Sequence, residues 1–185
     1  GNHVTVLNKD IKSQRALHFI LGTDYTFKAA DRNFKLSAEL YYKKLDQINP
    51  YTVDNVKIRY YGDNCAKGYA MGMDVKFFGE FVPGTDSWIS FSLMKSEQTI
   101  GETTKAPLPN SPSYNVSLFF QDYFPGYKRV KLNLKGVVAG GLPQTIPGQG
   151  YEAGYFRTPA YKRVDIGLSY QLAGGNDALM DKGLF

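Results

Sequence analysis

Apolar and polar residues alternate with a period of two along most of the chain. In residues 17–27 the odd positions carry Leu, Phe, Leu, Thr, Tyr and Phe, and the even positions carry His, Ile, Gly, Asp and Thr. Successive side chains of a β-strand point to opposite faces, so this alternation predicts a strand. The pattern recurs in residues 34–43, 68–77, 88–94, 114–121, 129–138 and 163–172, and residues 4–7 look like the end of one more strand. Several segments approach ten residues, the length of a strand that crosses a bilayer.

The connections between these segments alternate between short and long. Residues 29–33, 82–86 and 124–127 are short connections, and residues 46–67, 97–113 and 141–160 are long ones. This alternation predicts an all-β, antiparallel, up-and-down sheet whose two ends differ, as in outer-membrane barrels. We expect a transmembrane-type β-barrel segment of about seven or eight strands. Residues 1–172 would be one domain, part of a larger barrel, and residues 173–185 a turn or tail.

The two sets of alternating positions differ in chemistry. One set is apolar on every predicted strand and is expected to face lipid: Leu36, Leu40, Val75, Phe91, Leu118, Leu132 and Ile166. The other set is rich in Gly, Ser, Asn and charged residues, which fits a hydrated lumen. Aromatic residues gather near strand ends, where interfacial girdles form: Tyr25, Phe27, Tyr41, Tyr42, Phe77, Phe78, Tyr114, Tyr123, Tyr127, Tyr161 and Tyr170.

A second fold shares the same alternation. In a soluble or periplasmic β-barrel or sandwich, one face of each strand forms a core and the other meets water. Such a protein would bind a small apolar ligand in its interior. The position of the face that carries Val75 distinguishes the two interpretations. This face lies on the outside of a membrane barrel and lines the interior of a soluble one.

Composition supports β structure and narrows the partners. The 185 residues include 14 Tyr, 12 Phe and 19 Gly, with 15% aromatic residues, which favours strands with many turns. No apolar run approaches the roughly 18 residues of a membrane helix. The net charge is +5, but Lys and Arg are spread singly, so no nucleic-acid partner is expected.

The sequence carries no pattern of catalytic or metal-binding residues. Cys65 is the one cysteine and is expected to be a small loop residue without a disulfide. His3 and His18 are far apart in sequence, so neither a metal site nor a cofactor is expected. Asp74 and Asp165 are expected to pair with lysines in the lumen rather than to act as a catalytic acid pair. We therefore expect no enzyme, with a hydrolase as the weakest alternative.

Three stretches carry the spacing of a known family. Residues 66–74 read AKGYAMGMD, residues 141–143 read GLP, and residues 157–167 read RTPAYKRVDIG. Over residues 16–172 the chain resembles the C-terminal part of the barrel of a TonB-dependent outer-membrane receptor. The positions that carry the resemblance are Gly68, Tyr69, Gly72, Asp74, Gly141, Leu142, Pro143, Arg157, Pro159, Tyr161, Arg163, Asp165 and Gly167.

The resemblance implies a place and a role. It implies the bacterial outer membrane and a parent receptor that imports a large solute, such as a siderophore, a cobalamin-like molecule, a glycan or a peptide, by TonB-coupled active uptake. The implied partners are outer-membrane lipid, the solute, and the parent's plug domain and TonB. Without a plug, this stretch alone is expected to transport nothing. Its open edges predict edge-to-edge self-association or closure as a small barrel.

The long loops hold the candidate ligand-binding residues. Rigid aromatic side chains and arginine dominate binding hot spots, and the loops contain Tyr51, Arg59, Tyr60, Tyr61, Tyr151, Tyr155, Phe156 and Arg157. The competing interpretation is that these side chains pack against neighbouring loops.

Overall fold

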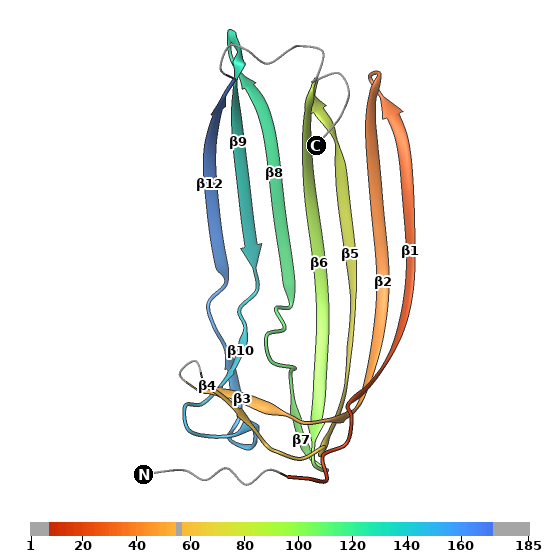
Figure 1. Cartoon of the computed structure of the whole chain (residues 1–185), viewed down its shortest axis with the longest axis vertical. Helices are drawn as coiled ribbons and strands as arrows, with labels where there is room; N and C mark the ends of the chain where they lie inside the picture. Colours follow the sequence, from red (N-terminus) through yellow and green to blue (C-terminus); the bar gives the residue numbers. More distant parts are fainter. Residues whose placement is uncertain (1–7, 55–56, 172–185) are drawn as a thin grey trace.

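The computed structural model describes residues 8–54 and 57–171. Its main sheet is antiparallel and has the order β1-β2-β5-β6-β8-β9-β12, with β7 paired to β6 beside this path. Figure 1 shows the long strands side by side in a single curved layer. The strands are β1 (Arg15–Ala29), β2 (Arg32–Ile48), β5 (Ala66–Val82), β6 (Thr85–Ile100), β7 (Thr104–Ala106), β8 (Tyr114–Phe124), β9 (Tyr127–Ala139) and β12 (Tyr161–Tyr170). The expected up-and-down sheet is thus confirmed.

Three two-residue turns close hairpins at one end of the sheet, which we call the turn end. Ala30 and Asp31 both have positive φ, 50° and 60°, as in the type I′ turns that suit a hairpin. The other two turns are Pro-Gly pairs with positive φ at Gly84 and Gly126, the arrangement of type II turns. A register shift adjoins both Pro-Gly turns but not the Ala-Asp turn. We attribute these bulges to the poorer match between a type II turn and the strand twist.

The three long connections lie together at the opposite end, which we call the loop end (Figure 1). They contain structure of their own: the hairpin β3 (Tyr51–Asp54)–β4 (Lys57–Tyr60), strand β7, the hairpin β10 (Pro143–Thr145)–β11 (Tyr155–Arg157) and the 3₁₀ turn η1 (Tyr151–Ala153). The predicted loop boundaries at 46–67 and 97–113 were wrong. Strand β2 continues to Ile48, β5 begins at Ala66 and β6 continues to Ile100.

The strands are longer than the roughly ten residues predicted. Strands β2 and β5 have 17 residues each and β6 has 16. In β2 and β6 most of the extra residues lie at the loop end, where polar residues dominate and the period-two signal fades. In β5 most of them lie at the turn end. The predicted strand end at residues 4–7, the last residue of the segment 163–172 and the predicted tail at 173–185 lie outside the described residues.

The strand register places all seven predicted lipid-facing residues on one face, the apolar face. Leu36 pairs with Phe77, Phe77 with Ile89 and Ile89 with Leu118, and the neighbouring rows follow the same order. This face is uncovered: Leu21 is 74% exposed and Ile166 is 72% exposed. Among the described residues, the buried hydrophobic cluster lies at the loop end. The sealed core of a soluble barrel or sandwich is therefore not what the structure shows.

The opposite face, the polar face, carries cross-strand polar contacts. Lys35 Nζ lies 2.9 Å from Asp24 Oδ2. Further along the sheet, the Gln121 amide donates to Asn133 Oδ1 at 2.8 Å, and the Asn133 amide donates to Ser169 Oγ at 3.1 Å. Such a chain of contacts across β8, β9 and β12 satisfies side-chain amides without burying them, as a wet surface allows. No helix in the described part of the chain is long and apolar enough to cross a membrane.

Aromatic rings cluster near both ends of the apolar face. Near the turn end, Phe34 stacks on Phe27 and Phe77, with ring centroids 5.7 and 5.6 Å apart, and Phe81 packs edge-on against Phe34. Towards the loop end, Tyr42 stacks on the ring of Tyr69. Part of the predicted girdle was wrong, because the register puts four of its members on the polar face: Tyr41, Phe78, Tyr123 and Tyr161.

Candidate functional site

A small buried cluster holds the loop end together. Tyr151 of η1 is 5% exposed and packs with Ile48, Ala66, Ile100 and Ala106, which come from the ends of β2, β5, β6 and β7. One ring from the third long loop therefore joins the ends of four strands. Cys65 is a free, half-buried thiol packed against this cluster.

Tyr61 connects the first and third loops. Its hydroxyl donates to the Glu152 carboxylate at 3.2 Å and accepts from the Tyr151 backbone N–H at 3.4 Å. Burial raises the pKa of Tyr61 and raises the pKa of Tyr151 to about 12. Burial disfavours the charged phenolate, so both phenols stay neutral at physiological pH and remain hydrogen-bond donors.

A hollow of about 240 Å³ lies between these two loops. It is lined by Thr52, Arg59, Tyr60, Tyr61 and residues 148–150. Tyr60 is 62% exposed, so its ring is free to contact a ligand. A guanidinium, phenols and backbone N–H groups can together bind oxygen-rich solutes by hydrogen bonds.

The hairpin β10–β11 brings two of the family motifs together. Pro143 pairs with Arg157, the Leu142 N–H donates to Thr158 Oγ1, and the Thr158 N–H donates back to the Leu142 carbonyl, both at 2.9 Å. A Cβ at Gly141 would overlap the Thr158 carbonyl, which explains the glycine. The GLP stretch and the start of the RTPAYKRVDIG stretch are thus two arms of one hairpin. The sequence shows each motif but gives no sign that they pair.

The family-motif residues of β5 make packing contacts within the sheet rather than lining a ligand site. A Cβ at Gly72 would overlap the Leu93 carbonyl and the Tyr41 ring, and a Cβ at Gly68 would lie 2.6 Å from the Glu97 carbonyl. Tyr41 thus covers the gap that Gly72 leaves on the neighbouring strand, a known compensation for glycine in sheets. Tyr69 lies on the apolar face, stacked on Tyr42. Asp74 lies on the polar face, opposite Glu39 of β2 and Ser92 of β6 in the strand register.

The motif residues of β12 also line the sheet. Arg163 Nε donates to Asp165 Oδ1 at 2.9 Å along the polar face, and Tyr161 lies in the same set of alternating positions. Gly167 pairs with Asn133, whose Cβ would lie 3.7 Å from an added Cβ. Pro159 lies two residues before the start of β12, where a missing N–H removes no ladder bond.

The eight candidate ligand-binding residues do not form one group. Arg59, Tyr60 and Tyr61 line the hollow, and the ring of Tyr51 packs at a tilt against that of Tyr60 beside it. For Tyr151 the packing interpretation fits, since its ring is buried.

The other three candidates lie around the second hairpin. Arg157 lies at its base, and its Nη1 donates to the carbonyls of Gly141 and Ser111. Tyr155 and Phe156 are half-exposed on β11, outside the hollow.

Sequence reasoning missed the residues that complete the hollow. Thr52 and the glycines of residues 148–150 line it, and Glu152 orients Tyr61. The run GQG in a long loop is a signal for close backbone approach, but nothing in the sequence pairs it with β3. Within residues 8–54 and 57–171, no group of three His, Cys, Asp or Glu side chains is placed to hold a metal ion.

The chain matches a known protein family. The family model described as TonB dependent receptor-like, beta-barrel, matches residues 1–180. No curated protein and no solved structure matches the chain. Proteins of the matched family are outer-membrane receptors and transporters of Gram-negative bacteria rather than enzymes. With its antiparallel wall, its two chemically distinct faces and this match over nearly its whole length, the chain belongs to the TonB-dependent receptor-like β-barrel family.

Proposed function

We propose that this chain forms a section of a receptor barrel wall, with its apolar face against lipid, its polar face towards the lumen and its loop end outside the cell. The observation that carries the proposal is the apolar face of β2. Between Arg32 and Lys44 this face is uncharged, with Phe34, Leu36, Ala38, Leu40 and Tyr42 in succession. Twelve residues span about 40 Å along a strand. With a strand tilt of about 40° the height is about 30 Å, the thickness of a bilayer's hydrocarbon core.

The lysines on the apolar face support that tilt. Lys44 on β2, Lys95 on β6 and Lys162 on β12 come progressively nearer the turn end. Followed through the strand register from β12 to β2, the row of residues that contains Lys162 reaches Ala38 after five steps between neighbouring strands. On β2, Ala38 is six residues from Lys44. With a rise of about 3.3 Å per residue and a strand spacing of about 4.8 Å, the line through these lysines is inclined by about 40° to the rows. Barrel strands tilt by this amount, so the three lysines share one depth in the membrane.

A charge placed on either face tests this orientation. Phe91→Arg puts a guanidinium near mid-depth on the apolar face, and Ser92→Arg puts one on the polar face of the same strand. Arginine at the bilayer midplane costs about 2–4 kcal/mol, so Phe91→Arg should lower the free energy of unfolding in lipid while Ser92→Arg leaves it within ~1 kcal/mol. Urea titration of the receptor in vesicles measures both. The reverse order of the two variants would contradict the proposed orientation.

The parent receptor, in this proposal, imports a large solute by TonB-coupled uptake, and the hollow between the first and third loops contributes to its recognition. Hydrogen-bonding groups gather there, with Arg59, Tyr60 and Tyr61 around glycine backbone. Siderophores, cobalamins and glycans all present many oxygen atoms to such groups. The plug and TonB act elsewhere in the parent.

Uptake by intact cells tests this role. Cells with and without the receptor gene are offered radioiron-loaded siderophores, radiolabelled cobalamin and labelled oligosaccharides. The proposal expects accumulation of one class that needs the receptor and stops with a protonophore. Arg59→Ala with Tyr60→Ala should then weaken binding of that class on ice. Exposed Tyr127→Ala at the turn end is the control. Equal uptake with and without the gene for every probe would exclude this import role.

The two edge strands support a further part of the proposal. Strands β1 and β12 end the order of the main sheet, and unpaired backbone groups are not tolerated in hydrocarbon. In the receptor, other strands pair with these edges. The isolated chain is expected to self-associate through them.

A further inference from the structure

We propose that the apolar face near the loop end binds a single phosphorylated acyl lipid, with an acyl chain in a hollow across β1, β2, β5 and β6 and the phosphate at Lys95. The inference rests on the lipid-facing orientation proposed above. It adds a specific lipid site to a surface that otherwise only contacts the bilayer.

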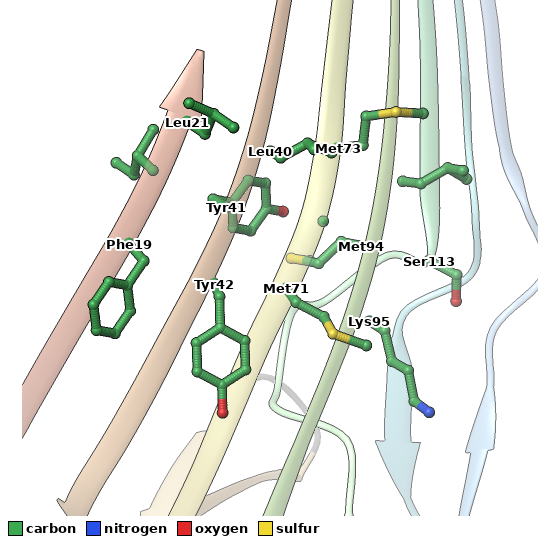
Figure 2. Close-up of a pocket in the computed structure, with 13 residues that line it drawn as sticks. Phe19, Leu21, Leu40, Tyr41, Tyr42, Met71, Met73, Met94, Lys95 and Ser113 are labelled. Carbon is green, nitrogen blue, oxygen red and sulfur yellow. The ribbon is translucent and has the colours of Figure 1, made fainter.

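The acyl part of the site is an apolar hollow of about 700 Å³. Two successive rows of apolar-face side chains line it (Figure 2). One row runs through Phe19, Tyr42 and Met71 to Lys95, and the other runs from Leu21 to Leu93. The row between them, which includes Gly72, points its side chains to the polar face, so its backbone forms the floor. A trough with aliphatic and thioether walls suits a flexible hydrocarbon chain.

The headgroup part adjoins this trough. A second, polar hollow of about 230 Å³ shares Met94, Lys95 and Ser113 with the first and adds Lys105 and Arg157. Its one acidic lining residue is Glu97. Three cations against one carboxylate favour an anion. Lys95 lies at the β6 end of the apolar trough (Figure 2), so a single amphiphile can occupy both hollows.

The surrounding charge favours an anionic lipid over a neutral one. Lys44, Lys67 and Lys162 also lie on the apolar face at this end, in the set of positions that contains Lys95. Among the described residues, Lys67, Lys95, Lys105 and Lys162 form no salt bridge. At the turn end Arg32 instead donates to the carbonyl of Phe81. Lysines at one headgroup level attract anionic lipid, so the two leaflets meet different surfaces.

Lipid selectivity in reconstituted receptor tests the site. The receptor is placed in phosphatidylcholine vesicles that contain a minor fraction of spin-labelled dipalmitoyl phosphatidate, and the retained label is compared with that of spin-labelled phosphatidylcholine. Each lysine near a charged headgroup contributes about fivefold to the preference. Lys95→Gln should therefore lower the preference for phosphatidate about fivefold, and Lys95→Gln with Lys105→Gln should lower it further. Lys76→Gln, on the polar face of β5, should leave it unchanged.

Two further arms separate the alternatives. Met73→Trp fills the trough and should reduce retention of long-chain phosphatidate while Lys95 is intact. Excess inorganic phosphate should not displace the lipid; displacement would overturn the inference in favour of a free-phosphate site. Receptor that inserts, as judged by protease protection, but shows no preference for phosphatidate overturns this inference alone. Receptor that does not insert into the vesicles overturns the proposed wall orientation as well.

Discussion

The guanidinium of Arg157 donates a hydrogen bond to the carbonyl oxygen of Gly141 at 2.9 Å. The same nitrogen donates to the Ser111 carbonyl at 3.1 Å. One side chain of the third long loop thereby holds both its own hairpin and the second long loop. A planar guanidinium directs several N–H groups at fixed angles, so the residue type matters as much as its charge.

Arg157→Lys should loosen these two loops although the charge is kept, because a flexible ammonium does not reproduce the two directed contacts. Loss of charged hydrogen bonds of this kind costs about 1.5–3 kcal/mol when they are buried and less at an exposed site. We expect about a tenfold faster protease cleavage in residues 107–113 and 146–150. The control is Tyr155→Ala, which removes an exposed ring of the same strand. Cleavage as slow in Arg157→Lys as in the unmodified chain would mean that these contacts do not hold the loops.

Gly72→Ala should destabilise the wall, since the added methyl group meets the Leu93 carbonyl and the Tyr41 ring. Overpacking of this kind costs about 1–3 kcal/mol. Gly22→Ala is the matched control on the same face, because its Cβ would meet the nearest atom, the Ala38 carbonyl oxygen, at an ordinary 3.6 Å. Urea unfolding in detergent micelles compares the two. Adding Tyr41→Ala to Gly72→Ala should restore part of the loss but not the part due to the Leu93 carbonyl.

Ionisation of Tyr151 should unlock the loop end at high pH. Its pKa is about 12 in the folded chain, above the ordinary tyrosine value of about 10. Below pH ~10 the phenol is neutral in both the folded and the unfolded state, so its packing is fully present. Between pH ~10 and ~12 the unfolded state gains free energy by ionising first, and the stability contributed by Tyr151 is lost as the pH rises.

The phenolate absorbance of the receptor measures this titration. The difference between the unmodified chain and Tyr151→Phe isolates one tyrosine, which should titrate near pH 12. Tyr61→Phe provides the comparison, because burial also raises the pKa of Tyr61. A difference curve for Tyr151 centred near pH 10 would show that its ring meets water.

Thiol labelling in intact cells should distinguish the two ends of the sheet. The native Cys65 is a poor reporter, because it packs against the buried cluster, so it is first replaced by serine. Thr103→Cys at the loop end should then react with a membrane-impermeant maleimide, and Asp86→Cys at the turn end should not; both positions are exposed. Permeabilised cells, in which both should react, are the control. The opposite labelling order would reverse the proposed orientation.

The sequence predicts the long strands because their chemistry alternates strictly between two environments. The apolar Leu36 between the polar Lys35 and Ser37 is enough to assign the two faces of its strand. The turn signals at Pro83–Gly84 and Pro125–Gly126 predict where two of the hairpins close. The boundaries at the loop end are less predictable. Near Ile48 and Ile100 the strand leaves the region with two distinct faces, and both residues pack under loops.

The site is harder to predict than the sheet. Tyr60 and Tyr151 are the same residue type in similar loops, yet one is exposed and the other buried. Their difference arises from the pairing of loops that are 91 residues apart at the contact between Tyr61 and Glu152. Residue type therefore nominates candidates, but long-range packing decides which of them are available to a ligand.

The two-residue turns have a consequence for how such a wall is made. A hairpin closed by two residues brings together partners that are close in sequence, and such contacts form on microsecond timescales. Three hairpins can therefore form independently, each starting at its turn, before the long connections at 49–65, 101–113 and 140–160 find their contacts. We expect the ring of Tyr151, whose partners come from four strand ends, to find its place after the hairpins have formed. In that order of assembly the loop end, with its proposed recognition surface, is completed last.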